Sequence, residues 1–262
     1  MSSVSIIMPV FNAALTLDQA VQSVCNQTHV DWILWLVDDA STDQSFEKIQ
    51  RWARMDSRIR QIRRPIRGGP ALARNDALSA NDSDYLAFLD ADDTWLPHKL
   101  KLQVQCMDRY GWDISYCNYQ RLHADRPWRD LCIVTPPCVM LSTLHFFNPI
   151  LISSAMVRWS ALKDLRFKPV MNEDYVFWHQ ALQQVAQAHR VESEGPLVRY
   201  RVSPDSHSAN KYRSALGHWR NLRRDFGLSW PMAMCGFAVY ALRSIRRDWL
   251  PRWVMRSGRV GQ

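Results

Sequence analysis

Unbroken apolar runs of strand length alternate with segments of helical spacing through the first part of the chain. The runs occupy residues 4–10, 32–37 and 85–89, and a further short strand is expected near residues 59–62. Between them, apolar residues recur three and four positions apart, which is typical of an amphipathic helix. Strands that alternate with helices predict βαβ units, and strands buried on both faces lack polar alternation. We therefore expect an α/β fold around a single Rossmann-like, mixed but mainly parallel sheet flanked by helices.

The remainder of the chain is less regular. The sequence predicts strands at 114–119, 150–157 and 197–202, a helix that begins near residue 172, and basic helical character after Ser206. Hydrophobic residues make up 47% and charged residues 22%, as in ordinary globular proteins. Because no repeat or clear linker interrupts the chain, we expect one domain over residues 1–210 and a basic helical extension over 211–262.

Polar clusters follow three of the predicted strands. They are Pro9 to Asn12, the pair Asp38 and Asp39, and Asp90 to Asp93. In open parallel sheets, ligands bind at the carboxyl ends of the strands. The βαβ pattern therefore places these clusters at one edge of the sheet, where they can form a single site.

The stretch Asp90-Ala91-Asp92-Asp93-Thr94 has two competing interpretations. It matches the Asp-x-Asp-x-Thr signature of haloacid dehalogenase-type phosphatases, in which Asp90 would be a nucleophile and Asp92 an acid/base beside Mg²⁺. A short match of this kind arises easily by chance, and it leaves the preceding residues without a role.

The second interpretation is supported by six ordered segments, which together span about residues 4–211. They are VSIIMPVFN (4–12), LVDDASTD (36–43), GGPALARNDAL (68–78), YLAFLDADDTWLPHKL (85–100), NEDYVFW (172–178) and RYRVSPDSHSANK (199–211). In this order they resemble the inverting, nucleotide-sugar-dependent glycosyltransferases of family 2, which have the GT-A fold, and in particular the bacterial surface-polysaccharide members. Ala40 stands where the family usually has glycine. A catalytically silent nucleotide-sugar-binding relative also stays open, although intact aspartates argue against it.

The resemblance implies a role for each polar cluster on the donor side. A divalent cation, Mn²⁺ or Mg²⁺, would bridge the diphosphate of the donor, because two negative charges develop on that leaving group. Asp90 and Asp92 would face the ribose and the metal, and either Asp92 or Asp93 would coordinate the metal directly. His207 is a further metal or diphosphate candidate. The implied nucleoside contacts are Pro9, Phe11, Asn12, Asp38 and Asp39, and Arg74 would pair with a carboxylate or a phosphate.

The acceptor side is assigned to Glu173 and Asp174. Inversion at the anomeric carbon is a single displacement, so one carboxylate must take the proton of the acceptor hydroxyl. The resemblance makes Asp174 this general base, with Glu173 beside it in the acceptor-side motif.

The extension carries most of the positive charge. Residues 211–262 contain eleven Lys/Arg against two Asp/Glu, interleaved with tryptophans, and residues 226–242 contain no charge. This composition favours a basic amphipathic helix at a membrane surface, and a helical layer packed on the domain is the alternative. No nucleic-acid-binding motif accompanies the charge, and the N-terminus lacks a secretory signal. We expect a peripheral enzyme at the inner face of the cytoplasmic membrane, with a nucleotide-sugar donor, most commonly UDP-linked, and a polyprenyl-diphosphate-linked saccharide acceptor.

Overall fold

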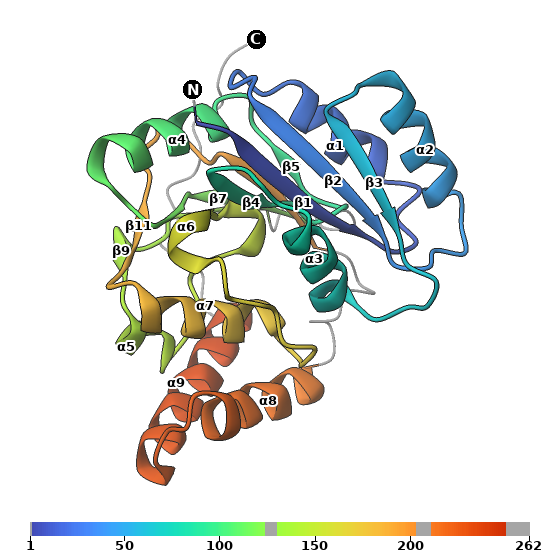
Figure 1. Ribbon diagram of the computed structural model, residues 1–262. Coiled ribbons are helices and arrows are strands. Elements are labelled where there is room, and N and C mark those ends of the chain that lie inside the picture. The colour runs from blue at the N-terminus through green and yellow to red at the C-terminus, as the bar shows by residue number, and fades with distance from the viewer. Residues whose placement is uncertain (1, 124–129, 203–210, 250–262) are drawn as a thin grey trace.

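The computed structural model describes residues 2–123, 130–202 and 211–249. The larger of its two sheets contains β1 (Val4–Val10), β2 (Trp32–Asp38), β3 (Ile59–Arg63), β4 (Tyr85–Phe88), β6 (Ile114–Tyr116), β9 (Cys138–Val139), β10 (Met156–Arg158) and β11 (Ala188–Arg190). Their order is β3-β2-β1-β4-β10-β6-β11-β9 (Figure 1). The first four strands in this order are mutually parallel, and β10 is antiparallel to both of its neighbours. The predicted mixed, mainly parallel sheet is confirmed.

A second, smaller sheet was not predicted. It contains β5 (Thr94–Trp95), β7 (Tyr119–His123), β8 (Leu131–Ile133) and β12 (Val198–Val202), in the order β5-β12-β7-β8. The prediction of one strand over 114–119 was wrong, because the chain breaks at Cys117 and Asn118 and passes from the large sheet at β6 to the small sheet at β7. Strand β12 confirms the strand predicted at 197–202.

The segment 150–157 also differs from the predicted strand. Residues Ile152–Ser154 form a 3-10 turn, η2, and only β10 that follows joins the sheet. Ser153 and Ser154 are fully buried in this turn, and buried hydroxyl groups need hydrogen-bond partners. The turn supplies such partners at the site described below.

Helices cover both faces of the large sheet (Figure 1). One face packs against α1 (Leu17–Cys25), α2 (Ser45–Met55) and α4 (Lys99–Tyr110), and the other against α3 (Pro70–Ser79), α5 (Leu141–Leu144), α6 (Trp159–Leu162) and α7 (Glu173–Gln184). Neighbouring residues of β1 divide between the two cores, since Ile6 and Met8 join one and Ile7 joins the other. Side chains alternate across a strand in this way, and both cores are therefore continuous with the same sheet.

The C-terminal extension begins with α8 (Lys211–Arg220) and continues through a π-helical turn, η3 (Asn221–Asp225), and α9 (Trp230–Trp249). Figure 1 shows α8 and α9 beneath α7, with the large sheet above them. Leu222, Phe226 and Ala233 are buried in the same core cluster as α7. The first part of the extension is thus a packed layer, while the domain boundary at residue 210 stays a prediction. Within the described ranges, no helix combines the length and apolar character that crossing a bilayer requires.

Candidate active site

The aspartates that follow β4 lie where the two sheets meet. The backbone N–H of Asp93 donates to the carbonyl oxygen of Asp90 over 3.0 Å, which closes the turn. Strand β5 follows directly and pairs antiparallel with β12. Because the turn is bounded by a strand of each sheet, its carboxylates have fixed positions at the carboxyl edge of the parallel strands.

Asp93 holds this turn together. Its carboxylate is fully buried, and it accepts hydrogen bonds from Ser153 Oγ at 2.5 Å and from the backbone N–H of Arg201 at 3.0 Å. The same Ser153 Oγ accepts the backbone N–H of Asp90 at 3.2 Å. Burial, together with the charges of Asp92 and Asp90, raises the pKa of Asp93 well above its ordinary value. Both carboxylate oxygens of Asp93 are therefore engaged with η2 and β12.

Asp92 is placed differently, because its side chain is only partly buried. Burial and the negative charge of Asp90 raise the pKa of Asp92 to about 6. A divalent cation would offset the repulsion between these two carboxylates, and Mg²⁺ is commonly bound by one or two carboxylates plus substrate phosphates and water. Asp92 fits such a cation. No group of three or more His, Cys, Asp or Glu side chains forms a complete metal cage in the described part of the chain. His207 lies outside the described residues.

Arg74 connects the donor-side aspartates to α7. Its side chain is 3% exposed, and its guanidinium donates to Asp90 Oδ1 at 2.7 Å and to Glu173 Oε1 at 2.8 Å. The sequence predicted a carboxylate or a phosphate as its partner, and the structure provides two carboxylates. Arg74 lies on α3, so one buried cation joins α3, the turn after β4 and α7.

Asp174 lies in the first turn of α7, next to Glu173. Burial and the charge of Glu173 raise the pKa of Asp174 to about 7. Asn148 Nδ2 donates to Asp174 Oδ2 over 3.3 Å, while Asn148 Oδ1 accepts the backbone N–H of Ile150. A general base is most effective when its pKa lies near the pH at which it works, and the shift at Asp174 is toward neutral pH.

Asp39 is engaged with the loop that leads from β3 to α3. Its carboxylate accepts the backbone N–H groups of Gly68 at 2.9 Å and Gly69 at 2.7 Å, and Arg64 Nη1 at 2.5 Å. Gly69 has φ +84°, a left-handed conformation that glycine adopts without steric cost. Asp39 therefore fixes the start of α3, and with it the position of Arg74.

Asp38 is fully buried, and one of its two carboxylate oxygens accepts no hydrogen bond among the described residues. Its Oδ1 accepts the backbone N–H of Ser41 at 3.3 Å, and its Oδ2 has no hydrogen-bond partner among the described residues. The nearest cation is Arg63, whose Nε lies 3.7 Å away. Arg63 and Ser41 also line a shallow pocket of about 330 Å³, together with Ala40, Arg64 and Pro65. Asp38 itself has no exposed side-chain surface and is not part of the pocket lining, so it lies behind Arg63 and Ser41 as seen from the pocket.

The turn after β1 lies beside this pocket. Pro9 pairs with Val37 in the strand register, one position before Asp38. Asn12 Oδ1 accepts the backbone N–H of Thr42 at 2.9 Å. The guanidinium of Arg67 lies 3.8 Å from the ring centroid of Phe11. The predicted nucleoside contacts thus gather at the ends of β1 and β2.

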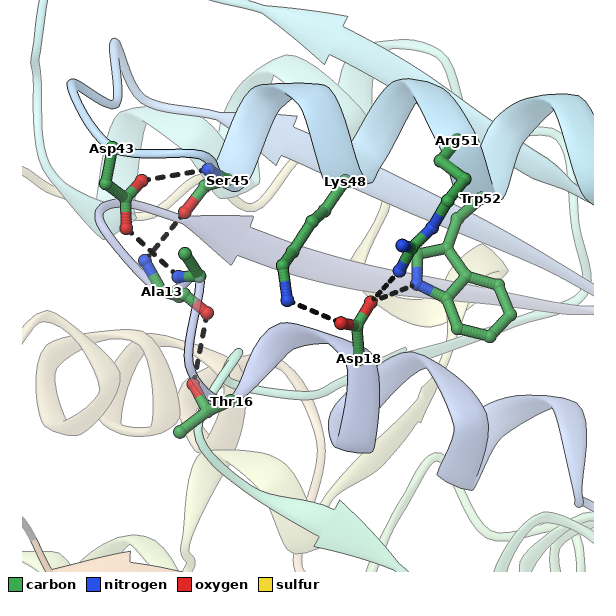
Figure 2. A network of polar contacts seen from close by, with 9 residues as sticks. Ala13, Thr16, Asp18, Asp43, Ser45, Lys48, Arg51 and Trp52 are labelled. Atoms are coloured by element: carbon green, nitrogen blue, oxygen red, sulfur yellow. Dashed lines mark hydrogen bonds and ion pairs between the residues drawn. The ribbon is translucent and has the colours of Figure 1, made fainter.

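Figure 2 shows how α2 anchors this turn. Ser45 Oγ accepts the backbone N–H of Ala13 at 2.8 Å, and Asp43 accepts the backbone N–H of Ala14 at 3.0 Å. Farther along α1, the carboxylate of Asp18 accepts hydrogen bonds from Lys48, Arg51 and Trp52 (Figure 2). These contacts hold α1 against α2, so the turn after β1 keeps its place beside the pocket.

Comparisons with known proteins agree with this geometry. The sequence model described as "Glycosyl transferase family 2" matches residues 5–136, which is half of the chain. The chain belongs to this family.

Two relatives extend the match beyond the family segment. An uncharacterized glycosyltransferase of Haemophilus influenzae is 33% identical, over 82% of this chain and 86% of its own. The Escherichia coli protein WfgD is named a UDP-Glc:alpha-D-GlcNAc-diphosphoundecaprenol beta-1,3-glucosyltransferase, and it is 30% identical over 82% of this chain and 83% of its own.

Solved structures of glycosyltransferases share the fold. S. aureus TarS in complex with UDP-GlcNAc superposes with a TM-score of 0.70 at 18% identity, covering 94% of this chain and 72% of that one. The mannosyltransferase PcManGT of Pyrobaculum calidifontis, in complex with GDP-Man and Mn²⁺, gives a TM-score of 0.67 at 19% identity, covering 95% and 71%. The predicted GT-A fold is confirmed.

Membership of this glycosyltransferase family decides between the two interpretations of Asp90 to Thr94. The match begins at β1 and includes every donor-side cluster, whereas the phosphatase signature accounts for five residues alone. The structure is consistent with that choice, because Asp90 is paired with Arg74. The individual roles of the site residues in this family member stay predictions.

Sequence reasoning missed Arg63 and Arg64, which pair with Asp38 and Asp39, and two further side chains that touch the other acidic residues. Ser153 contacts Asp93, and Asn148 contacts Asp174, and both lie in the irregular region before β10. The signal for Ser153 was a pair of serines inside an apolar run, because such buried hydroxyls need polar partners. For Asn148, the only signal was an Asn-Pro turn directly before the strand predicted at 150–157, and such a turn is too common to single out the residue.

Proposed function

We propose that this protein is an inverting glycosyltransferase that moves a sugar from a UDP-sugar to a polyprenyl-diphosphate-linked saccharide in bacterial surface-polysaccharide synthesis. The observation that carries the proposal is the bridge made by Arg74. A donor-side aspartate and the helix that begins with Glu173 and Asp174 share one buried cation. Donor and acceptor chemistry would therefore take place in the same cleft.

The donor half of the site would bind the nucleotide at the ends of β1, β2 and β4. Asp38 is the residue that we assign to the nucleoside, because its Oδ2 accepts no hydrogen bond among the described residues and its ion-pair partner Arg63 lines the adjacent pocket. Asp39 supports this region through the loop before α3. We expect Phe11 and Asn12, in the turn after β1, to contact the nucleoside as well.

We assign Asp92 as the direct ligand of Mn²⁺ or Mg²⁺. The oxygens of Asp93 already accept hydrogen bonds from Ser153 and from the backbone of Arg201, whereas Asp92 lies beside Asp90 with a raised pKa. When bound, the cation would neutralise the charge that develops on the diphosphate leaving group. Its presence in the mannosyltransferase of similar fold supports the assignment.

Asp174 would act as the general base. The acceptor hydroxyl oxygen attacks the anomeric carbon, the bond from that carbon to the diphosphate oxygen breaks, and Asp174 takes the hydroxyl proton. Asn148 orients the carboxylate through its hydrogen bond. Glu173 is tied to Arg74, so it holds α7 against the donor aspartates instead of competing for the proton. General-base assistance of this kind contributes about 10²–10⁴-fold to the rate.

The lipid-linked acceptor is supported by the relatives. The name of WfgD specifies a diphosphoundecaprenol acceptor, and the family resemblance implies acceptors of this class. Such an acceptor is embedded in the membrane, so we place the enzyme at the inner face of the cytoplasmic membrane, held there by its basic extension.

A donor screen tests the proposal. Thermal unfolding is followed with UDP, dTDP or GDP at millimolar concentration, with and without Mn²⁺. A micromolar site would be stabilised by about 4 kcal/mol under these conditions. We expect a Mn²⁺-dependent shift for UDP that Asp92→Asn abolishes. Transfer to a diphosphate-linked saccharide is then measured for the wild type and for Asp174→Asn.

The two assays separate the possible outcomes. Loss of transfer in Asp174→Asn with the UDP shift intact supports the proposal. Binding by the wild type without any transfer indicates a silent nucleotide-sugar-binding relative. Full activity of Asp174→Asn contradicts the assignment of the base.

A further inference from the structure

The two faces of α9 have opposite surroundings. The inner face is tightly packed, because Ala233 is fully buried and a Cβ atom added at Gly236 would lie 2.3 Å from the carbonyl oxygen of His145. The outer face carries Trp230, Met234 and Leu242, which are 62%, 62% and 61% exposed. This close packing fixes which residues of α9 point outward.

The outward residues form a continuous apolar stripe. Trp230, Met234, Ala238 and Leu242 are all exposed and follow one another at intervals of four residues, so they lie along one side of the helix. A surface helix of a globular protein normally turns charged and polar residues toward water. No charged residue occurs between Phe226 and Leu242. We therefore expect this face of α9 to bind a partner with an apolar surface.

Cations lie beside the start of the stripe. The guanidinium of Arg223 lies 4.6 Å from the ring centroid of Trp230, and Arg220 and Arg224 are exposed on the preceding turns. Tryptophan with neighbouring arginine is typical of the boundary between lipid headgroups and acyl chains. An anionic lipid surface offers both an apolar layer for the stripe and negative charge for the arginines, which an apolar protein groove does not.

We propose that the outward face of α9 lies flat in the headgroup boundary of an anionic membrane, with Trp230, Met234 and Leu242 inserted. This rests on the proposed function, in that it specifies how the enzyme meets a membrane-embedded acceptor. Three stacked rings connect the inner face of α9 to the site: the ring centroid of Tyr240 lies 4.2 Å from that of His218, which lies 5.4 Å from that of Tyr175 of α7. Tyr175 follows the candidate base Asp174, so docking of the outer face of α9 would fix the position of α7 relative to the bilayer.

Vesicle binding tests the proposal with the full chain. Co-sedimentation is measured with vesicles of phosphatidylcholine alone and with phosphatidylglycerol added. The variant Met234→Gln/Leu242→Gln is compared with Val30→Ser/Met55→Gln, which replaces side chains of similar exposure, 61% and 68%, at the far end of the molecule. We expect the wild type to prefer anionic vesicles, the α9 variant to bind at least tenfold more weakly, and the control variant to bind like the wild type. Circular dichroism checks that both variants are folded.

Two outcomes would overturn the proposal. One is equal binding by the α9 variant and the control. The other is a wild-type dimer in light scattering that the α9 variant dissociates while vesicle binding is unchanged, because the stripe would then be a contact between two copies.

Failure of the proposed function is distinguishable from failure of membrane docking. Transfer is also assayed with a short-chain, water-soluble acceptor. The α9 variant should retain that activity and lose transfer to the same saccharide on a long polyprenyl chain in vesicles. A wild type that binds vesicles but transfers to neither acceptor contradicts the proposed function and leaves the docking surface supported.

Discussion

Replacing Arg74 by methionine tests whether this residue is the structural link between the donor and acceptor halves of the site. Methionine preserves most of the apolar stem of arginine but cannot pair with Asp90 or Glu173. Removing one partner of a buried ion pair costs about 3–5 kcal/mol, because the remaining charge stays uncompensated. The Asp90 and Glu173 side chains are 31% and 19% exposed, so water solvates part of the remaining charge. We therefore expect a loss at the lower end, about 3 kcal/mol.

The assay is urea unfolding at neutral pH, with Arg51→Met as the matched control. Arg51 also pairs with an aspartate, Asp18, but its side chain is 56% exposed. Exposed pairs contribute about 0–1 kcal/mol, so the control should unfold close to the wild type. Adding Glu173→Gln to Arg74→Met should recover part of the loss, because it removes one of the two uncompensated charges. If Arg74→Met unfolds at the same urea concentration as Arg51→Met, the buried bridge does not exist in solution and the reasoning is refuted.

Four further predictions concern single residues of the site. Ala40→Gly should stabilise the fold by about 0.5–1 kcal/mol in the same urea assay, because Ala40 has φ +58° and this left-handed conformation costs an L residue about 1–2 kcal/mol. Part of that gain is offset by the backbone entropy that glycine loses on folding. Unchanged or lower stability would argue against the left-handed backbone at this position. The transfer rate should rise with pH through about 7, since Asp174 must lose its proton to act as a base and its pKa is raised to about 7. The residual activity of Asp174→Asn should not show this rise. A flat pH profile in the wild type would argue against Asp174 as the base. Mn²⁺ affinity, measured by calorimetry, should fall as the pH is lowered through about 6, because the pKa of Asp92 is raised to about 6 and a proton then competes with the metal for its carboxylate. The same affinity at pH 5 and pH 7.5 would exclude Asp92 as a ligand. Ser153→Ala should lower the free energy of unfolding by about 1–3 kcal/mol, seen as a lower urea midpoint, since it leaves an oxygen of the buried Asp93 without its hydrogen-bond donor. An unchanged midpoint would mean that this hydrogen bond contributes nothing to stability.

The sequence by itself determined the features that depend on local pattern. The apolar runs specify β1, β2 and β4, because parallel strands buried on both faces consist of near-continuous apolar residues, whereas the edge strand β3 carries Arg60 and Arg63. The ends of these strands specify one edge, and the acidic clusters at Asp38 and Asp90 follow from that placement. The family resemblance of the ordered segments was confirmed by the comparison.

Only the tertiary structure decided what the individual carboxylates contact. Asp92 and Asp93 are adjacent and chemically identical, yet one is partly exposed beside Asp90 and the other is saturated by Ser153 and Arg201. Asp38 and Asp39 divide in the same way, because only Asp39 meets the loop before α3. These differences come from contacts between residues about 25 to 110 positions apart, which no local pattern encodes.

For the C-terminal extension, too, the sequence predicted the general character and the structure showed which side is buried. Its charge and tryptophans were visible in the sequence and were compatible with either a packed layer or a membrane-facing helix. In the structure one side of the extension is a packed layer and the other is exposed, since Phe226 and Ala233 enter the core while Trp230 and Met234 stay outside. Helical spacing alone could not decide this, because residues 226–242 are uncharged on every side of the helix. Only packing against α8, η3 and His145 at the end of α5 determines which side is covered.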